Sequence, residues 1–312
     1  EIVDVEITEH PRSISFIKEK LKGKRLTKDE IYKIIRDIAD NALTEIEVAF
    51  FISAVYTKDM TLEEIRNLIK AMVETGNKLK LKGKIADKHS IGGIAGNRTT
   101  PIVVSICSAT GLIMPKTSSR AITSAAGTTD VIETVAEVEF SVDEIKEIIK
   151  KTNACMVWGG ALGLAPVDDK IIRIEGMVNI DSTSQLLASI LSKKISVGSK
   201  YVLIDIPYGK SAKVTKKQAE FLKQKFLTLG KLFGLKIKVV LTNGTEPIGN
   251  GVGPVLEIKD VLKVLKREDD APKDLEEKSL FLAGELLELT EKAKKGKGIE
   301  LAKQILYSGE AF

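Results

Sequence analysis

Apolar residues recur at helical spacing through the first quarter of the chain. A threonine precedes a glutamate by three positions at Thr27, Thr44 and Thr61, and each pair opens an apolar pattern of helical period. Such a pair caps the start of a helix, because each side chain accepts a hydrogen bond from the other residue's backbone. We therefore predict about four short antiparallel helices over residues 13–76, with Gly76 ending the last. This stretch has no cluster of catalytic side chains, so its expected roles are scaffold, dimer contact or moving lid.

From Lys82 onward, short apolar runs alternate with amphipathic ones, and this predicts strands alternating with helices. The predicted strands cover 84–88, 112–115, 154–158, 201–206 and 236–241, and the predicted helices cover 100–109, 123–134, a segment capped at 141–144, 180–195, 215–233 and most of 255–306. Such alternation is typical of an α/β domain whose mostly parallel central sheet is covered by helices on both faces. Ligands of such domains bind at the carboxyl ends of the strands.

The expected organisation is therefore a small all-helical domain followed by a larger α/β domain. The helical domain is predicted over residues 13–78, joined in space by helices around 165–196, and the α/β domain is predicted over residues 79–312. Residues 1–12 resemble a linker from a preceding segment, and the chain is expected to be a fragment of a longer protein.

Composition narrows the class of partner. The chain has 48 Lys and Arg against 43 Asp and Glu, a formal net charge of +5, and 5% aromatic residues. This excess is diffuse and stacking platforms are few, so we expect no nucleic-acid partner. With 29% charged residues and no signal peptide or bilayer-length apolar run, we expect a soluble cytoplasmic protein with no membrane partner. The Lys/Glu-rich, Cys-poor composition leans towards a thermophile.

Several familiar cofactor motifs are absent or incomplete. Gly209-Lys210-Ser211 resembles the end of a phosphate-binding P-loop, but Ile204 stands where the motif needs glycine. No GxGxxG follows a predicted strand, and no HExxH or His/Cys cluster has metal-ligand spacing. Cys107 and Cys155 lie in apolar runs and are expected to be buried, reduced thiols. We therefore expect no cofactor and no metal.

Two runs combine small residues, hydroxyls and a cation where a predicted strand leads into a predicted helix. The first spans residues 87–100 and includes Lys88 and the pair Gly92-Gly93, and the second spans residues 117–130 and includes Arg120. Glycine lets the backbone approach a ligand, and helix-start N–H groups with hydroxyls and a cation suit phosphate. Two such runs in one domain predict a substrate with more than one anionic group.

Together these runs resemble a known enzyme family. The sequence Gly-Thr-x-Asp-x-x-Glu at 127–133 is similar to the signature of the thymidine and pyrimidine-nucleoside phosphorylases, Asp-Lys-His-Ser-x-Gly-Gly at 87–93 is similar to their phosphate loop, and residues 188–194 are similar to their base-binding helix. The likeness runs from about residue 13 to the end, and in detail it is to the archaeal AMP phosphorylases. It implies a cytoplasmic, homodimeric pentosyltransferase that converts AMP and phosphate to adenine and ribose 1,5-bisphosphate, and also acts on CMP and UMP, in nucleotide degradation. Higher assembly is expected to need terminal segments missing from the chain.

The resemblance also implies roles for individual residues. A phosphate and nucleotide cradle is implied at Lys88, Ser90, Gly93, Ser119, Arg120, Ala121, Ile122, Thr123, Ser124, Thr128, Ser189, Lys193 and Lys213, with Thr100 and Ser118 close by. Asp181 resembles the family's proton donor, at the start of the predicted helix 180–195, with Ser189 two turns later on a similar face. Taken alone, Asp181 could equally be the N-cap of that helix.

Departures from the family pattern bear on the substrate. Ser124 stands where the nucleoside phosphorylases have histidine, Ala126 stands where they have glycine, and ahead of the base-binding helix only Arg173 is present, without their tyrosine. The first run is one residue longer and adds Asn97 and Arg98. Fewer base contacts and more cations predict recognition of a 5′-phosphate, for which Arg98, Arg120 and Lys213 are the candidates.

Three other functions remain open from sequence alone. A thymidine or uridine phosphorylase would act on the nucleoside instead of the nucleotide. A phosphoribosyltransferase of the same fold, such as that acting on anthranilate, would need Mg²⁺ and pyrophosphate chemistry. A non-catalytic nucleotide-binding module would bind AMP without releasing adenine.

Overall fold

The computed structural model describes residues 10–121, 126–160 and 162–312. The chain divides into two compact units, of which the first contains the residues up to Thr75 with Pro166–Ser189, and the second contains Gly76–Ala165 with Ile190–Phe312.

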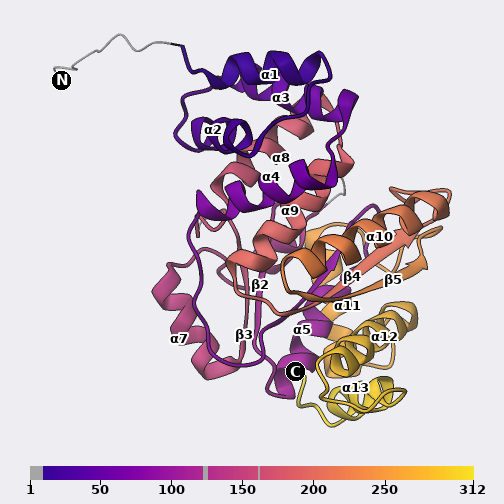
Figure 1. Cartoon of the computed structure of the whole chain (residues 1–312). Helices are drawn as coiled ribbons and strands as arrows, with labels where there is room; N and C mark the ends of the chain where they lie inside the picture. The colour runs from indigo at the N-terminus through magenta and orange to yellow at the C-terminus, as the bar shows by residue number, and fades with distance from the viewer. Residues whose placement is uncertain (1–9, 122–125, 161) are drawn as a thin grey trace. The chain divides into compact units, whose positions relative to one another are not determined.

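The first unit is a bundle of short helices. Its members are α1 (Ser13–Leu21), α2 (Lys28–Ala39), α3 (Glu45–Lys58), α4 (Leu62–Glu74) and α8 (Pro166–Val178), which lie side by side (Figure 1). Capping boxes open α2, α3 and α4 at Thr27, Thr44 and Thr61, as the sequence predicts. The buried pair Lys20–Glu64, with N and O atoms 2.8 Å apart, joins α1 to α4. Helix α8 has no predicted counterpart with these bounds.

Gly76 follows the end of α4 for a reason that the sequence did not reveal. The helix ends at Glu74 with a right-handed Thr75 at its C-cap, so no left-handed glycine terminates it. A Cβ on Gly76 would lie 2.3 Å from the carbonyl oxygen of Leu164. Glycine is therefore required there for close backbone approach within the second unit.

The strands that the structure describes in the second unit all pair in parallel. They are β1 (Ala86–Ser90), β2 (Met114–Ser118), β3 (Ala154–Trp158), β4 (Tyr201–Tyr208) and β5 (Lys236–Asn243). Strand β4 lies between β1 and β5, and β2 pairs with β3. A parallel bridge between Ile85 and Ile113 places β1 next to β2. The carboxyl ends of β1 and β2, where the two glycine-containing runs begin, are therefore neighbours.

Helices cover these strands (Figure 1). Those of the second unit are α5 (Thr99–Ala109), α6 (Thr128–Glu133), α7 (Val142–Thr152), α10 (Lys216–Leu232), α11 (Pro254–Lys266), α12 (Lys273–Leu289) and α13 (Gly298–Tyr307), and α9 (Thr183–Ser196) begins in the first unit and ends in the second. One hydrophobic core joins apolar residues of α5, α12 and α13 to β1 and β4. The α/β prediction with a parallel sheet is confirmed.

Two helix starts differ from the prediction. Ala126 and Gly127 are not helical, and helix α6 begins at Thr128, where Asp130 accepts hydrogen bonds from the backbone N–H groups of Ala121 and Gly127; the predicted start at 123 lies outside the described residues. Helix α9 begins at Thr183 and not at 180, so Asp181 lies before it.

Candidate functional site

The turn after β1 brings three chain segments into close backbone contact. Gly92, Gly93 and Gly96 have φ of +82°, +88° and +77°. A Cβ on Gly93 would lie 2.7 Å from the Cβ of Lys213, and one on Gly96 would lie 2.0 Å from the carbonyl oxygen of Ile248. Glycine is therefore required at both positions, by conformation and by space. The structure thus places two predicted site residues, Gly93 and Lys213, side by side.

Lys88 lies beneath this turn, fully buried, with Ser90 two residues further at the end of β1. Its ammonium donates hydrogen bonds to the hydroxyls of Thr99 and Thr100, at 2.7 and 3.2 Å. These threonines open α5, whose amino end carries partial positive charge. Thr99 was missed by the sequence reasoning, although two hydroxyls in succession at a helix start were the available signal. A cation, two hydroxyls and a helix start together form the kind of site that holds an anion.

Burial is the main influence on the ionisation of Lys88. Desolvation lowers the pKa of its ammonium from 10.5 to about 8, the carboxylate of Asp205 opposes this, and Lys278 and Arg98 add to it. Burial is thus the main reason why the charged form of Lys88 is disfavoured, and acids and other cations lie on both sides of the balance. A bound phosphate nearby would favour the charged ammonium.

The second run forms a turn organised by Asp130. One carboxylate oxygen of Asp130 accepts hydrogen bonds from the backbone N–H groups of Ala121, at 2.8 Å, and Gly127, at 2.7 Å. A Cβ on Gly127 would lie 2.7 Å from the carbonyl oxygen of Ser119, so the two ends of the turn approach closely. This places Ser119 near the start of α6 and its Thr128. The predicted residues Ile122, Thr123 and Ser124 lie outside the described residues.

Arg98 joins the two turns. Its guanidinium donates to the carbonyl oxygen of Ala126 at 2.5 Å and to the hydroxyl of Thr128 at 3.2 Å, and its Nε forms an ion pair with Glu257. Arg98 and Glu257 are both buried. The guanidinium is thus bound to protein groups in this structure, and the predicted role of Arg98 at a 5′-phosphate stays a prediction. The partner Glu257 is 159 positions away in the sequence, which hid this ion pair from sequence reasoning.

Arg120 is likewise held by protein groups. Its guanidinium pairs with Glu133 and with Glu139, the latter at 3.1 Å, and lies 4.9 Å from the ring centroid of Trp158. The hydrogen bonds that this guanidinium donates to Glu133 raise its pKa further above its already high value. Because the Arg120 side chain is 39% exposed, these pairs contribute little stability individually. These contacts hold the guanidinium of Arg120 next to protein carboxylates.

Asp181, the predicted proton donor, belongs to the first unit and is exposed. It lies two residues before α9, so the prediction that it shares a helix face with Ser189 was wrong. Ser189, on α9, donates a hydrogen bond to the buried Asp168 of α8 at 3.1 Å. Lys193, one turn later on α9, belongs to the second unit.

An ion cluster that the sequence reasoning missed lies inside the second unit. The carboxylate of Asp87, on β1, lies 2.8 Å from the ammonium of Lys194 and 3.6 Å from that of Lys116. All three are nearly or fully buried. Burial, followed by the nearby lysines, lowers the pKa of His89 well below its usual value. His89, between the predicted residues Lys88 and Ser90, is therefore neutral at physiological pH.

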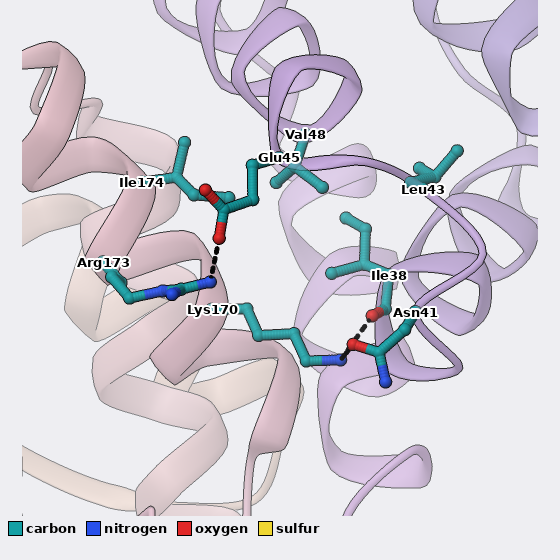
Figure 2. Close-up of a pocket in the computed structure, with 8 residues that line it drawn as sticks. All are labelled: Ile38, Asn41, Leu43, Glu45, Val48, Lys170, Arg173 and Ile174. Carbon is teal, nitrogen blue, oxygen red and sulfur yellow. Dashed lines mark hydrogen bonds and ion pairs between the residues drawn. The ribbon is translucent and has the colours of Figure 1, made fainter. Parts of the chain in front are cut away.

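The helical unit contains a separate small hollow of about 110 Å³ (Figure 2). Lys170 of α8 crosses it to donate to the carbonyl oxygens of Ile38 and Ala39, at 2.8 and 2.9 Å, at the end of α2. Arg173 forms an ion pair with Glu45 on the opposite side. A lysine that binds the last carbonyls of a helix stabilises the helix end. The polar side chains of this hollow thus join α8 to α2 and α3.

Among residues 10–121, 126–160 and 162–312, no group of three or more His, Cys, Asp or Glu side chains could hold a metal ion. No helix in this part of the chain is long and apolar enough to cross a membrane.

Comparison with known proteins identifies related sequences over nearly the whole chain. An AMP phosphorylase of Thermococcus kodakarensis is 50% identical over 97% of this chain, and one of Pyrococcus furiosus is 48% identical over 100% of it. A Legionella pneumophila protein named "Putative thymidine phosphorylase" is 45% identical over 97%. The chain spans 60%, 62% and 60% of the length of these three relatives, respectively. The resemblance to AMP phosphorylases is confirmed.

Solved structures share the fold at low sequence identity. An anthranilate phosphoribosyltransferase of Thermus thermophilus superposes with a TM-score of 0.74 at 17% identity, over 95% of each chain. The Saccharomyces cerevisiae anthranilate phosphoribosyltransferase gives a TM-score of 0.75 at 15% identity, over 96% of this chain and 94% of that one. At such identity the likeness concerns the fold alone.

Two family models match consecutive parts of the sequence. The helical bundle domain of a glycosyl transferase family matches residues 14–76, and the a/b domain of the same description matches residues 82–312. The second match alone covers most of the chain. The chain therefore belongs to this glycosyl transferase family.

Proposed function

We propose that the protein containing this chain is a phosphorylase of nucleoside 5′-monophosphates, which converts AMP and phosphate to adenine and ribose 1,5-bisphosphate. The observation that carries the proposal is the meeting of two glycine-containing turns at the neighbouring ends of β1 and β2, joined by Arg98. Two anion-binding turns suit a reaction whose substrates are both phosphates. The named AMP phosphorylases at 50% and 48% identity support the same substrate class.

The attacking phosphate is assigned to the hydroxyls and backbone of the two turns. The hydroxyls of Thr99, Thr100 and Thr128 accept hydrogen bonds from the buried cations Lys88 and Arg98. A hydroxyl that accepts from a cation keeps its own proton for another acceptor, and a phosphate oxygen can be that acceptor. Such fixed donors would hold the phosphate in position for attack on C1′. The bond formed joins a phosphate oxygen to C1′, and the bond broken joins C1′ to the base.

The departing adenine must gain a proton, which the proposal assigns to Asp181. A carboxylic acid keeps its proton near neutral pH when it is buried or when negative charge lies nearby. Because Asp181 is exposed, the proposal requires negative charge, and the substrate phosphates would supply it. His89, which is neutral at physiological pH, is suited to contact with an uncharged base.

The 5′-phosphate is assigned to Lys213, beside the Gly93 turn. The assignment rests on the predicted role of Lys213 and on its close approach to Gly93. Arg98 and Arg120, the other candidates from the sequence, pair with Glu257 and with Glu133. Extension of the activity to CMP and UMP is part of the proposal and requires a direct assay.

The experiment is a substrate comparison with the full-length protein. AMP, CMP, UMP and thymidine are each incubated with and without inorganic phosphate, and base release is followed by chromatography. The proposal expects phosphate-dependent release from AMP at least about tenfold faster than from thymidine, a difference of about 1.4 kcal/mol in the barrier. Activity in EDTA separates this reaction from a Mg²⁺-dependent phosphoribosyl transfer. Tight AMP binding without adenine release would instead support a binding module.

A pyrimidine-nucleoside phosphorylase is the second candidate, favoured by one observation. The Legionella pneumophila relative that carries a thymidine phosphorylase name is 45% identical, close to the values for the AMP phosphorylases. Faster release from thymidine than from AMP in the assay above decides for this candidate.

Replacement of the proposed acid gives a separate prediction. Asp181→Asn keeps the size of the side chain and cannot deliver a proton, so turnover should fall by about 10²–10⁴-fold while AMP binding persists. The matched control is Asp143→Asn, which alters an exposed carboxylate of α7. Near wild-type turnover by Asp181→Asn would falsify the assignment.

A further inference from the structure

Arg98 connects three segments that are distant in sequence. It precedes α5 at the end of the first turn, and its guanidinium donates to Ala126 and Thr128 of the second turn. Its Nε pairs with Glu257 in the first turn of α11, and the other carboxylate oxygen of Glu257 accepts from the backbone N–H of Gly253 at 3.0 Å. Glu257 is 1% exposed. The carboxylate is therefore fixed from two sides, and it fixes the guanidinium in turn.

The contact with Thr128 has a chemical consequence. A hydroxyl has one proton to donate and lone pairs that accept. Because Arg98 can only donate, the Thr128 oxygen is the acceptor in their 3.2 Å contact. The Thr128 proton is thus free to turn away from the guanidinium. Hydrogen bonds to ionised groups are about twice as strong as neutral ones, so a phosphate oxygen is the preferred acceptor for that proton.

We propose that Arg98, anchored by Glu257, is a positioning residue that orients the Thr128 hydroxyl as a donor to the attacking phosphate. This inference rests on the proposed phosphorylase function and names the group that sets phosphate affinity within it. Arg98 acts through Thr128 and through the carbonyl of Ala126, and it does not touch the substrate. Its pair with Glu257 removes the unpaired charge that burial would otherwise penalise.

Lysine cannot reproduce this arrangement. The guanidinium offers donors in a rigid planar fork, and Arg98 directs them to three different acceptors, Glu257, Ala126 and Thr128. An ammonium in Arg98→Lys keeps the charge beside Glu257 and reaches fewer of these acceptors. The variant therefore retains the buried ion pair, which protects folding, and loses the orientation of Thr128.

The first test measures steady-state kinetics of the full-length protein. Arg98→Lys should raise the KM for inorganic phosphate at least about tenfold while kcat and the KM for AMP change less than about threefold, because one ground-state interaction with phosphate is lost. The control is Lys263→Gln on α11, which breaks the ion pair of Lys263 with the exposed Asp270. It should leave all three constants unchanged. If Arg98→Lys raised the KM for phosphate and the KM for AMP by the same factor, the substitution would have damaged the site in general, and the proposal would be overturned.

The second test asks whether Arg98 acts through Thr128. In a Thr128→Val background the hydroxyl is absent, so adding Arg98→Lys should raise the phosphate KM less than about twofold further, a strongly non-additive result. Additive effects would mean that Arg98 acts by another route. Glu257→Gln, which keeps an acceptor and removes the charge, should follow Arg98→Lys in direction.

A third measurement keeps this inference separate from the proposed function. Hydrogen exchange of the ligand-free protein needs no substrate, and Arg98→Lys should speed exchange in the segment 126–133 by at least about tenfold while α12 and α13 are unchanged. If the wild-type protein fails to cleave AMP but Arg98→Lys shows this local change in exchange, the proposed phosphorylase function is refuted and the inferred Arg98 contact is retained. Unchanged exchange in the variant refutes the Arg98 inference whatever the activity is.

Discussion

Replacing Lys88 by methionine should make the ligand-free protein more stable at neutral pH. Methionine is similar in length to lysine and carries no charge. Lys88 is fully buried, and desolvation lowers the pKa of its ammonium from 10.5 to about 8. One pKa unit corresponds to about 1.4 kcal/mol, so the buried charge costs about 3 kcal/mol. The variant also loses hydrogen bonds to Thr99 and Thr100, at about 1 kcal/mol each. The expected net stabilisation at pH 7 is therefore about 1 kcal/mol.

The sign of the stability difference between Lys88→Met and the wild-type protein reverses at high pH. A lysine whose pKa is lower in the folded protein binds fewer protons there than in the unfolded chain between pH 8 and 10.5, so the wild-type gains stability as pH rises through that window. The gain approaches the same figure of about 3 kcal/mol. Lys88→Met lacks this gain and should be about 2 kcal/mol less stable than wild-type at pH 10.5.

The assay is urea-induced unfolding of both proteins at pH 7 and pH 10.5. Lys273→Met, a change at an exposed lysine on α12, is the control and should show no pH-dependent difference from wild-type. A difference between Lys88→Met and wild-type that stays constant across this pH range would refute the reasoning that Lys88 is a costly buried charge. Such a cost is reasonable at a site that we propose binds anions, where stability and function oppose one another.

Two further predictions concern glycines and thiols. Gly96→Ala should lower the free energy of unfolding by about 2 kcal/mol or more, because φ is +77° and its Cβ would meet the Ile248 carbonyl. Gly176→Ala in α8 should raise the free energy of unfolding by about 1 kcal/mol, because the described chain places no atom within 4 Å of a Cβ there. Urea unfolding measures both, and equal stability of the two variants contradicts the close approach. Burial raises the pKa of Cys107 and raises that of Cys155 to about 12, so neither thiol should react with a thiol-specific dye at pH 8 until urea is added. Rapid native reaction would contradict that burial.

Local signals made the helical unit predictable. The capping boxes at Thr27, Thr44 and Thr61 need only residues three positions apart, and each opens a helix where predicted. The alternation of strands and helices predicted the parallel sheet in the same way. The predicted roles of the site residues remain predictions.

Features that depend on contacts between residues distant in the sequence could not be predicted from it. Asp130 accepts a hydrogen bond from the backbone of Ala121, nine positions away, and α6 begins at Thr128, although the sequence pattern predicted an earlier start. Arg98 was predicted to bind a phosphate because it adds a cation to the glycine-rich first run, and its pair with Glu257, 159 positions away, cannot be seen in the sequence. A cation in a glycine-rich run therefore indicates an anion site, while its direct partner depends on tertiary structure.

The most direct measurement is a crystal structure of the full-length protein with AMP and inorganic phosphate. The account predicts a phosphate oxygen about 2.7 Å from the Thr128 hydroxyl, a typical O–H···O distance, with Arg98 still paired to Glu257 and the AMP phosphate beside Lys213. Phosphate bound away from both turns, or an Arg98 guanidinium that leaves Glu257 to contact either substrate, would contradict it.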